Sequence, residues 1–409
     1  MVAPFVAQSL LENNPPAMQR WLFFLLAILA ANSLAAVTRE AVESPHRTLR
    51  QLGRVHLKGI HRDEEHQHRD VFALPNDFSL RASVTTQSVT TNPSIAAPPE
   101  TSGFRGSIDN GIFPSDAAGA VSASFLLSVT NASVVAQDRS GNRLSDISLA
   151  DFWHDPAYPD GALYDPRVAH DNDTDHWIIC TLYDVSFKKS TLLVAVSDGS
   201  NPSLGWHRYR FTIDPNDVLD ADLTRMALTR DTIVLTANLF DGDLPSFVGI
   251  FTIRESDAFA APAALPVTLT HAPPNIFDLV PVDNRDDGLP YFVVTRGAVD
   301  LAIYTLQDGM LTNARNPDAP ALGISNSSPA PDPAPQFGSS LRLNSGPMYV
   351  ANGVLRSGTL WVATQPYFLS PLRSSVMWWR IVMTSLSTRT LESSMIQAAL
   401  RSIRSLRSR

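Results

Sequence analysis

From about residue 104 onward, short apolar runs of four to eight residues alternate with clusters of Gly, Pro, Asn and Asp. The runs are rich in Val, Ile, Thr, Phe, Tyr and Trp, which is typical of β-strands. Examples are SFLLSVT, HWIICTLY, TLLVAVS, TIVLTANLF, FVGIFTI, LAIYTL, TLWVATQ and VMWWRIVMT. No long stretch before the C-terminal tail has the 3.6-residue period of an amphipathic helix. The pattern therefore predicts an all-β chain.

The pattern also repeats, at intervals of about 49–58 residues. A polar residue stands ahead of each cluster of strands, and a strong apolar strand follows it. These polar residues are Asp116, Asp165, Asp222, Asp278 and Gln336. Because each interval has room for four short antiparallel strands, the repeat predicts a β-propeller with about five four-stranded blades. No N-terminal strand that would complete the last blade is evident, so an incomplete or C-terminally truncated ring stays open as an alternative.

Four segments are expected along the chain. The run Trp21–Ala31 has 11 apolar residues, whereas a membrane span needs about 20. With Arg20 before it and small residues after it, the run predicts a cleaved export signal over residues 1–36, with Met18 as an alternative start. We therefore expect a secreted protein, extracellular or periplasmic, without a stable membrane span. The other segments are a polar His-rich leader and Ser/Thr/Pro linker (37–103), the propeller (104–390) and a basic tail (391–409).

The net charge and the few cysteine and histidine residues limit the partners and metal sites that the chain can have. The formal net charge of −8 gives no electrostatic reason to expect a nucleic-acid partner. Cys180 is the one cysteine, which excludes an intramolecular disulfide and a multi-cysteine zinc site, and its apolar surroundings favour a structural thiol over a nucleophile. The spacing of His61, His66 and His68 would suit a metal ion, although a solvated leader is the simpler interpretation.

Six segments of the chain carry recognisable motifs: FPSDAAGAV, LYDPRVAHDNDTDHWIIC, TLLVAVSDGSNPSLGWHRYRF, VLTANLF, APQFGSS and SGTLWVATQ. Together they resemble a family of secreted bacterial β-propeller proteins. The resemblance covers roughly residues 104–385 and implies the propeller fold, but it implies little about function. Ser115 departs from the family, which has a second Pro there. The hairpin Ser197–Trp206 is similar to the Asp-box turns of sialidase-like propellers, with longer spacing, and this similarity implies a structural role.

The repeated polar residues are the main candidates for a binding site. In a propeller the first strand of each blade lines the central channel, so side chains at its start converge. The predicted binding residues are Asp116, Asp165, Arg167, Asp222, Asp278 and Gln336. Converging carboxylates need a compensating charge, and Asp165, Asp222 and Asp278 are candidate ligands of Ca²⁺, which prefers oxygen. The alternative is that each Asp caps a turn through its own backbone.

Three functions are compatible with this pattern. We favour non-catalytic binding of an extracellular glycan or protein partner through the channel mouth and its loops. The alternative is a propeller-type glycoside hydrolase that uses Asp165 and Asp222, because YDPRV is similar to the blade start of arabinanase-like enzymes. Those enzymes use a Glu as acid, and the only Glu residues from residue 101 onward, Glu255 and Glu392, are not placed in the channel. A third possibility is a truncated fragment without activity of its own. The oligomeric state is not indicated.

Overall fold

A computed structural model of the chain describes residues 36–48, 103–107, 112, 114–185, 190–216, 218–242, 244–274, 276–296, 300–314 and 350–364, with the short segments 334–335, 342–343, 377–382 and 391–395. Residues 1–35 of the predicted export signal, the leader histidines His61, His66 and His68, and Gln336 lie outside the described residues. The helices of the described part, α3 (Leu149–Trp153) and α4 (Glu255–Phe259), have five residues each, and no helix there is long and apolar enough to cross a membrane.

The described strands form five four-stranded antiparallel units in chain order. The first unit contains β2 (Ala118–Val121), β3 (Phe125–Val129), β4 (Ser133–Asp138) and β5 (Arg143–Ser148). The second contains β6 (Ala162–Asp171), β7 (His176–Asp184), β8 (Thr191–Ser197) and β9 (Gly205–Thr212). The third contains β10 (Leu219–Leu228), β11 (Thr232–Asp241), β12 (Leu244–Arg254) and β13 (Ala264–His271).

The fourth and fifth units have the same plan. The fourth contains β14 (Val280–Asn284), β15 (Tyr291–Arg296), β16 (Asp300–Gln307) and β17 (Met310–Asn313). The fifth contains β20 (Val350–Arg356), β21 (Thr359–Thr364), β22 (Met377–Val382) and β23 (Leu391–Met395). A separate two-stranded sheet is formed by β18 (Ala334–Pro335) and β19 (Arg342–Leu343). Since β23 begins at Leu391, the propeller extends into the segment that the sequence assigns to the basic tail.

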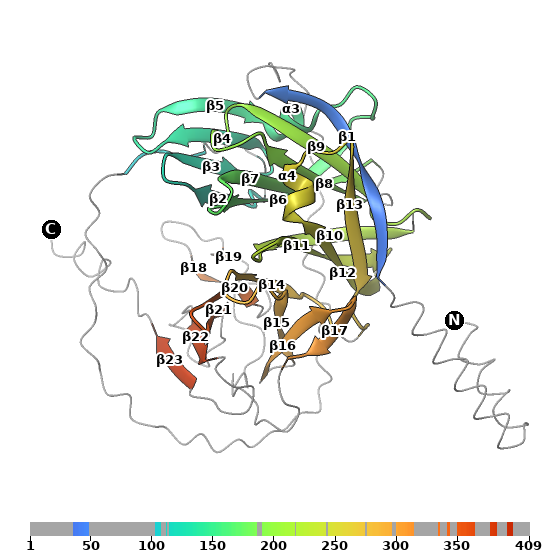
Figure 1. Cartoon of the computed structure of the whole chain (residues 1–409), viewed down its shortest axis with the longest axis vertical. Coiled ribbons are helices and arrows are strands. Elements are labelled where there is room, and N and C mark those ends of the chain that lie inside the picture. Colours follow the sequence, from blue (N-terminus) through green and yellow to red (C-terminus); the bar gives the residue numbers. More distant parts are fainter. Residues whose placement is uncertain are drawn as a thin grey trace, which may run out of the picture.

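The first strand of each unit lies beside the first strand of the next. Contacts join β2 to β6, β6 to β10 and β10 to β14, and β14 pairs with β20 in parallel. The units therefore follow one another around a common centre, with their later strands farther out (Figure 1). Radial repetition of four-stranded antiparallel sheets is the β-propeller architecture, so the predicted all-β propeller class is confirmed, while the number of blades in the whole chain stays a prediction.

The second unit shows why the sequence has continuous apolar runs instead of simple alternation. Successive side chains of a strand point to opposite faces, and both faces of β7 are covered by other units. Trp177 and Ile179 pack in a cluster shared with the first unit, whereas Ile178 and Cys180 pack in a cluster shared with the third. Burial raises the pKa of the Cys180 thiol to about 12, which agrees with a structural role.

An additional strand lies outside the four-stranded pattern. β1 (Val37–Thr48) pairs antiparallel with β9 and with β13, the last strands of the second and third units. It therefore joins the two units into one nine-stranded sheet, and in Figure 1 it runs as a long blue strand beside β13. The sequence analysis expects a solvated leader here. The difference arises because β1 contains few apolar residues, and its strand conformation depends on pairing with two distant strand edges.

Candidate functional site

Four residues that lie within or just before the first strands share one backbone conformation. Asp116, Asp165, Leu223 and Asp278 have φ angles of 42°, 53°, 58° and 55°, in the left-handed region that is rare outside glycine. In β6 and β10 this residue lies where the pairing register shifts, which marks a β-bulge. The recurrence of this uncommon conformation explains the repeated polar residues, because Asp tolerates the left-handed region better than most side chains.

The third repeat differs from the sequence alignment by one residue. Leu223 occupies the left-handed position, and Asp222 precedes it, paired with Asn238 across the strands. The repeat pattern predicts Asp222 as the equivalent residue because an Asp stands at this place in the neighbouring repeats. The conformation is tolerated at Leu223 because its N–H group is held by two carboxylates: those of Asp165, at 2.6 Å, and Asp222, at 2.9 Å.

Three of the four left-handed residues donate their N–H group to a side chain of the preceding unit. The N–H of Asp165 donates to Oδ1 of Asn131 (3.0 Å), that of Leu223 to Oδ2 of Asp165, and that of Asp278 to Oδ1 of Asn238 (3.1 Å). We call these three hydrogen bonds the inter-unit latch. Asn131 and Asn238 are functional positions that the sequence analysis did not select, although Asn238 lies in the TAN strand segment noted there.

Burial and neighbouring acids determine the charge state at the latch. Asp165 is 7% exposed, and burial together with the nearby carboxylate of Asp222 raises its pKa to about 6, although Arg167 opposes the shift. Burial and the charge of Asp165 also raise the pKa of Asp116. A hydrogen-bond contact with Asp165 adds to the rise of the Asp116 pKa, and one with Asp222 adds to the rise of the Asp165 pKa. The three carboxyl groups therefore form one contiguous acidic cluster across three units.

Two arginines lie beside the acidic residues. Nε of Arg167 donates to the carbonyl oxygen of Thr224 at 2.8 Å, so it joins the second unit to the third as well as opposing the charge of Asp165. Arg225, two residues beyond Leu223, lies 3.7 Å from the carboxylate of Asp278. Both arginines are half-buried. Four of the six predicted binding residues, Asp116, Asp165, Arg167 and Asp222, therefore lie close together, whereas Asp278 lies beside Arg225 and Gln336 lies outside the described residues.

The described residues contain one group of three side chains with metal-ligand atoms within 4.8 Å of one another, and it consists of His46, Asp198 and His207. Asp165, Asp222 and Asp278 do not form such a group in the described part of the chain. Asp278 instead lies beside Arg225. A Ca²⁺ site shared by these three aspartates stays a prediction.

A second charged cluster lies at the opposite end of β6. Arg285 contacts Asp171 at 2.7 Å and Glu255 at 3.3 Å, and these residues belong to the fourth, second and third units. Asp171 is six residues beyond Asp165, or roughly 20 Å along the strand. Burial raises the pKa of Glu255 to about 7, with Arg285 opposing the shift and Asp171 adding to it. No local sequence signal indicates this cluster, because its members are far apart in the chain.

Comparisons with known proteins assign no family to the chain. No protein-family model matches the chain, and no curated protein matches its sequence. Similar solved structures include a proposed exo-β-1,3-galactanase from Bifidobacterium bifidum, at 11% identity over 70% of this chain and 92% of that chain (TM-score 0.34). A second is an exo-β-1,3-galactanase from Clostridium thermocellum, at 10% identity over 68% of this chain and 60% of that chain (TM-score 0.34). A third is an exo-1,5-α-L-arabinanase from a bovine ruminal metagenomic library, at 10% identity over 68% of this chain and 96% of that chain (TM-score 0.33). Likenesses of this size do not bear on the activity of this chain.

The latch predicts a specific loss of stability. Asn131→Ala removes the acceptor of the Asp165 N–H group and the two hydrogen bonds that Nδ2 donates to Asp116 and to the carbonyl oxygen of Pro114. We expect the free energy of unfolding to fall by about 1–3 kcal/mol, because a buried N–H group is left without its partner. Urea denaturation measures the change. Ser140→Ala, at an exposed position in the same unit, should change it by less than about 0.5 kcal/mol, and equal losses would contradict the latch.

The raised pKa of Asp165 predicts a pH-dependent stability difference. The folded state holds this proton more tightly than the unfolded chain, so the free energy of unfolding falls as pH rises from about 4 to 7. Asp165→Asn retains an oxygen for the Leu223 N–H group but cannot ionise. The free energy of unfolding of the variant should therefore rise by on the order of 2–3 kcal/mol relative to that of the wild type as the pH increases over this range. Urea denaturation at each pH tests this, with exposed Asp160→Asn as the control, and parallel wild-type and Asp165→Asn curves would refute it.

Proposed function

We propose that the protein binds an extracellular glycan along its first strands. The observation that carries the proposal is a set of half-buried charged side chains that lie within or just before successive first strands. The members are Asp116, Arg167, Asp222, Arg225 and Asp278. Export from the cell and binding of a protein partner stay predictions.

The mixture of charges favours a ligand rich in hydroxyl groups. Carboxylates accept hydrogen bonds and guanidinium groups donate them, and a hydroxyl group can do both. Neighbouring hydroxyls of a sugar ring therefore match an array of alternating acids and arginines. Because the formal net charge is −8, an acidic glycan is disfavoured relative to a neutral one.

An aromatic side chain at the same end of the second unit supports an extended ligand. Tyr158 lies four residues ahead of β6, is 38% exposed, and stacks on the Arg210 guanidinium at 4.1 Å from the ring centre. Arg210 belongs to β9, three strand spacings or roughly 14 Å from the first strand. A ligand that reaches both Tyr158 and the acidic cluster would be an oligosaccharide.

Glycoside hydrolysis is the second candidate, and one observation favours it. Asp165 has a pKa of about 6, so it can hold a proton near neutral pH, as a general acid must. The contact between Asp165 and Asp222 argues against this role for the pair, because hydrolysis requires carboxyl groups about 5–9 Å apart with the scissile bond between them. The spacing of Asp165 and Asp222 therefore does not suit hydrolysis by this pair, and hydrolysis stays the alternative to the proposed binding.

A glycan-array screen of the purified protein, followed by calorimetry on the best neutral oligosaccharide, tests the proposal. Asp222→Asn removes a charge and keeps the shape of the side chain, and we expect it to weaken binding by roughly 10-fold or more, or about 1.4 kcal/mol. Asp173→Asn, at the opposite end of the second unit, should leave the affinity unchanged. Absence of any bound glycan, or equal effects of the two variants, would rule out this site.

The same glycans distinguish binding from hydrolysis. We expect the wild-type protein to return its bound oligosaccharide intact after prolonged incubation, as measured by the release of reducing ends. Release that Asp165→Asn reduces by roughly 10²–10⁴-fold would show general acid catalysis and would replace the binding proposal.

A further inference from the structure

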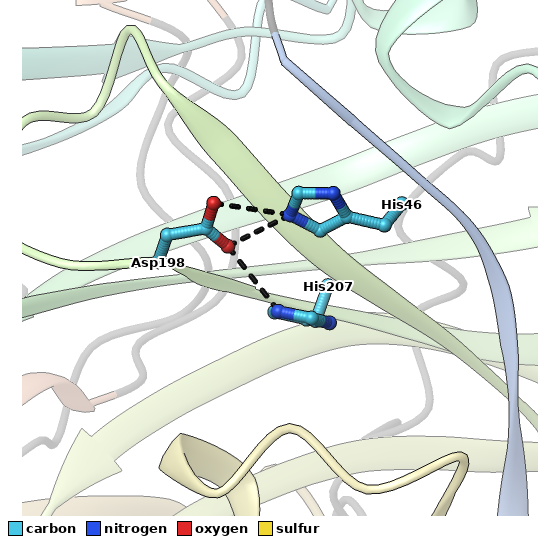
Figure 2. Close-up of side chains that lie close together, drawn as sticks. All are labelled: His46, Asp198 and His207. Atoms are coloured by element: carbon cyan, nitrogen blue, oxygen red, sulfur yellow. Dashed lines mark hydrogen bonds and ion pairs between the residues drawn. The ribbon is translucent and has the colours of Figure 1, made fainter.

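Three side chains from two separate parts of the chain meet at the outer edge of the second unit. His46 comes from β1, His207 from β9, and Asp198 from the turn between β8 and β9 (Figure 2). Nε2 of His46 lies 2.8 Å and 3.0 Å from the two carboxylate oxygens of Asp198, and Nε2 of His207 lies 3.2 Å from Oδ1. The two imidazole rings are 4.5 Å apart between centres.

These separations are close to those required around a small divalent cation. Zinc binds nitrogen and oxygen ligands at about 2.0–2.2 Å in tetrahedral geometry, which places neighbouring ligand atoms about 3.3 Å apart. The ligand atoms of His46, Asp198 and His207 all lie within 4.8 Å of one another. Small side-chain rotations would therefore centre an ion between them.

The backbone around the cluster is shaped to admit these side chains. The pairing of β1 with β9 shifts register between Ser44 and Arg47, so His46 lies in a bulge, a feature that re-aims side chains. A Cβ atom at Gly205 would come within 1.9 Å of Asp198 Oδ2 and 2.6 Å of His46 Nε2. Glycine at position 205 therefore keeps open the space in which the carboxylate and imidazole meet.

A second carboxylate orients one of the histidines. Oδ1 of Asp198 faces Nε2 of His207, while Nδ1 of the same ring lies 2.7 Å from Oε1 of Glu43. If Nδ1 donates its proton to Glu43, the neutral ring presents a lone pair at Nε2 toward a carboxylate oxygen. Two acceptors then face each other, and a cation between them resolves the repulsion. Carboxylates that hold a metal-binding histidine in this way are common around protein-bound zinc.

We propose that His46, Asp198 and His207 bind Zn²⁺ and thereby fasten β1 to the hairpin β8–β9. Two imidazole nitrogens and one carboxylate oxygen suit zinc better than Ca²⁺ or Mg²⁺, which prefer all-oxygen ligands. The His46 and Asp198 side chains are 41% and 40% exposed, so the fourth coordination position faces solvent and takes a water molecule. This site is independent of the proposed glycan site, which lies on the first strands.

Calorimetric titration of ZnCl₂ into the chelator-treated full-length protein tests the ligand set. We expect one strong site, with His46→Ala and His207→Ala each weakening it by at least roughly 100-fold, and Glu43→Gln by roughly 10–100-fold. His154→Ala, a histidine outside the cluster, should bind like the wild type. Because His46 is exposed, its substitution should preserve folding, which circular dichroism checks, and His46→Gln provides a second variant.

The leader histidines provide the decisive control. A triple variant, His61→Ala with His66→Ala and His68→Ala, should retain the strong site. Loss of Zn²⁺ binding in this variant, or unchanged binding in His46→Ala and His207→Ala, would overturn the proposal. The visible absorption of bound Co²⁺ should indicate tetrahedral coordination in the wild type, and an octahedral spectrum would contradict the assigned geometry.

Amide hydrogen exchange tests the fastening of β1. Zn²⁺ should slow the exchange of the β1 amides in the wild type and leave it unchanged in His207→Ala. Exchange that Zn²⁺ does not alter in the wild type would refute the fastening role. Protection by Ca²⁺ or Mg²⁺ in place of Zn²⁺ would refute the assigned metal.

Discussion

The arrangement of the units depends on three backbone N–H groups that lie within or just before successive first strands. Each N–H group donates a hydrogen bond that a side chain of the preceding unit accepts. The residues that donate, Asp165, Leu223 and Asp278, are held in the left-handed conformation. That conformation costs about 1–2 kcal/mol per residue, and an unsatisfied buried N–H group costs about 1–3 kcal/mol more. Both costs are avoided or offset only when neighbouring units pack in one register, so the same hydrogen bonds fix the angular position of each sheet and of the charged residues it carries.

The latch alone does not explain why an aspartate lies at its centre. Asn131 and Asn238 accept the equivalent hydrogen bonds as neutral amides. An asparagine at position 165 would serve equally well and would avoid burying a charge beside Asp116 and Asp222. A left-handed backbone and a raised pKa at one residue are more often found at functional sites than at purely structural ones. The hydrogen bond to Leu223 alone does not require the charge of Asp165, so this residue is a candidate functional residue.

The sequence predicts what is local and periodic, and it misses what depends on contacts between distant segments. The apolar runs and the repeated Asp residues identify the all-β propeller, because the left-handed conformation favours the same residue type at each repeat. The repeated Asp residue does not identify Leu223, because the conformation of Leu223 is stabilised by the carboxylates of Asp165 and Asp222 and not by its own side chain. The repeat pattern does not identify Arg285 and Glu255 either, because their contact joins different units.

β1 illustrates the same limit at the outer side of the molecule. Sheets that radiate from a centre diverge outward, and here one strand fills the space between β9 and β13. It buries Ala41 in the core but otherwise attaches through polar groups: Arg39 donates to the carbonyl oxygen of Ile213 at 2.8 Å, and Glu43 and His46 contact the second unit. A strand with so little apolar surface gains little from hydrophobic burial, so its position must depend on backbone pairing and on these polar contacts. His46, His207 and Asp198 lie at the end of this strand. An additional bond between β1 and the second unit at this place would stabilise a strand that hydrophobic burial holds only weakly.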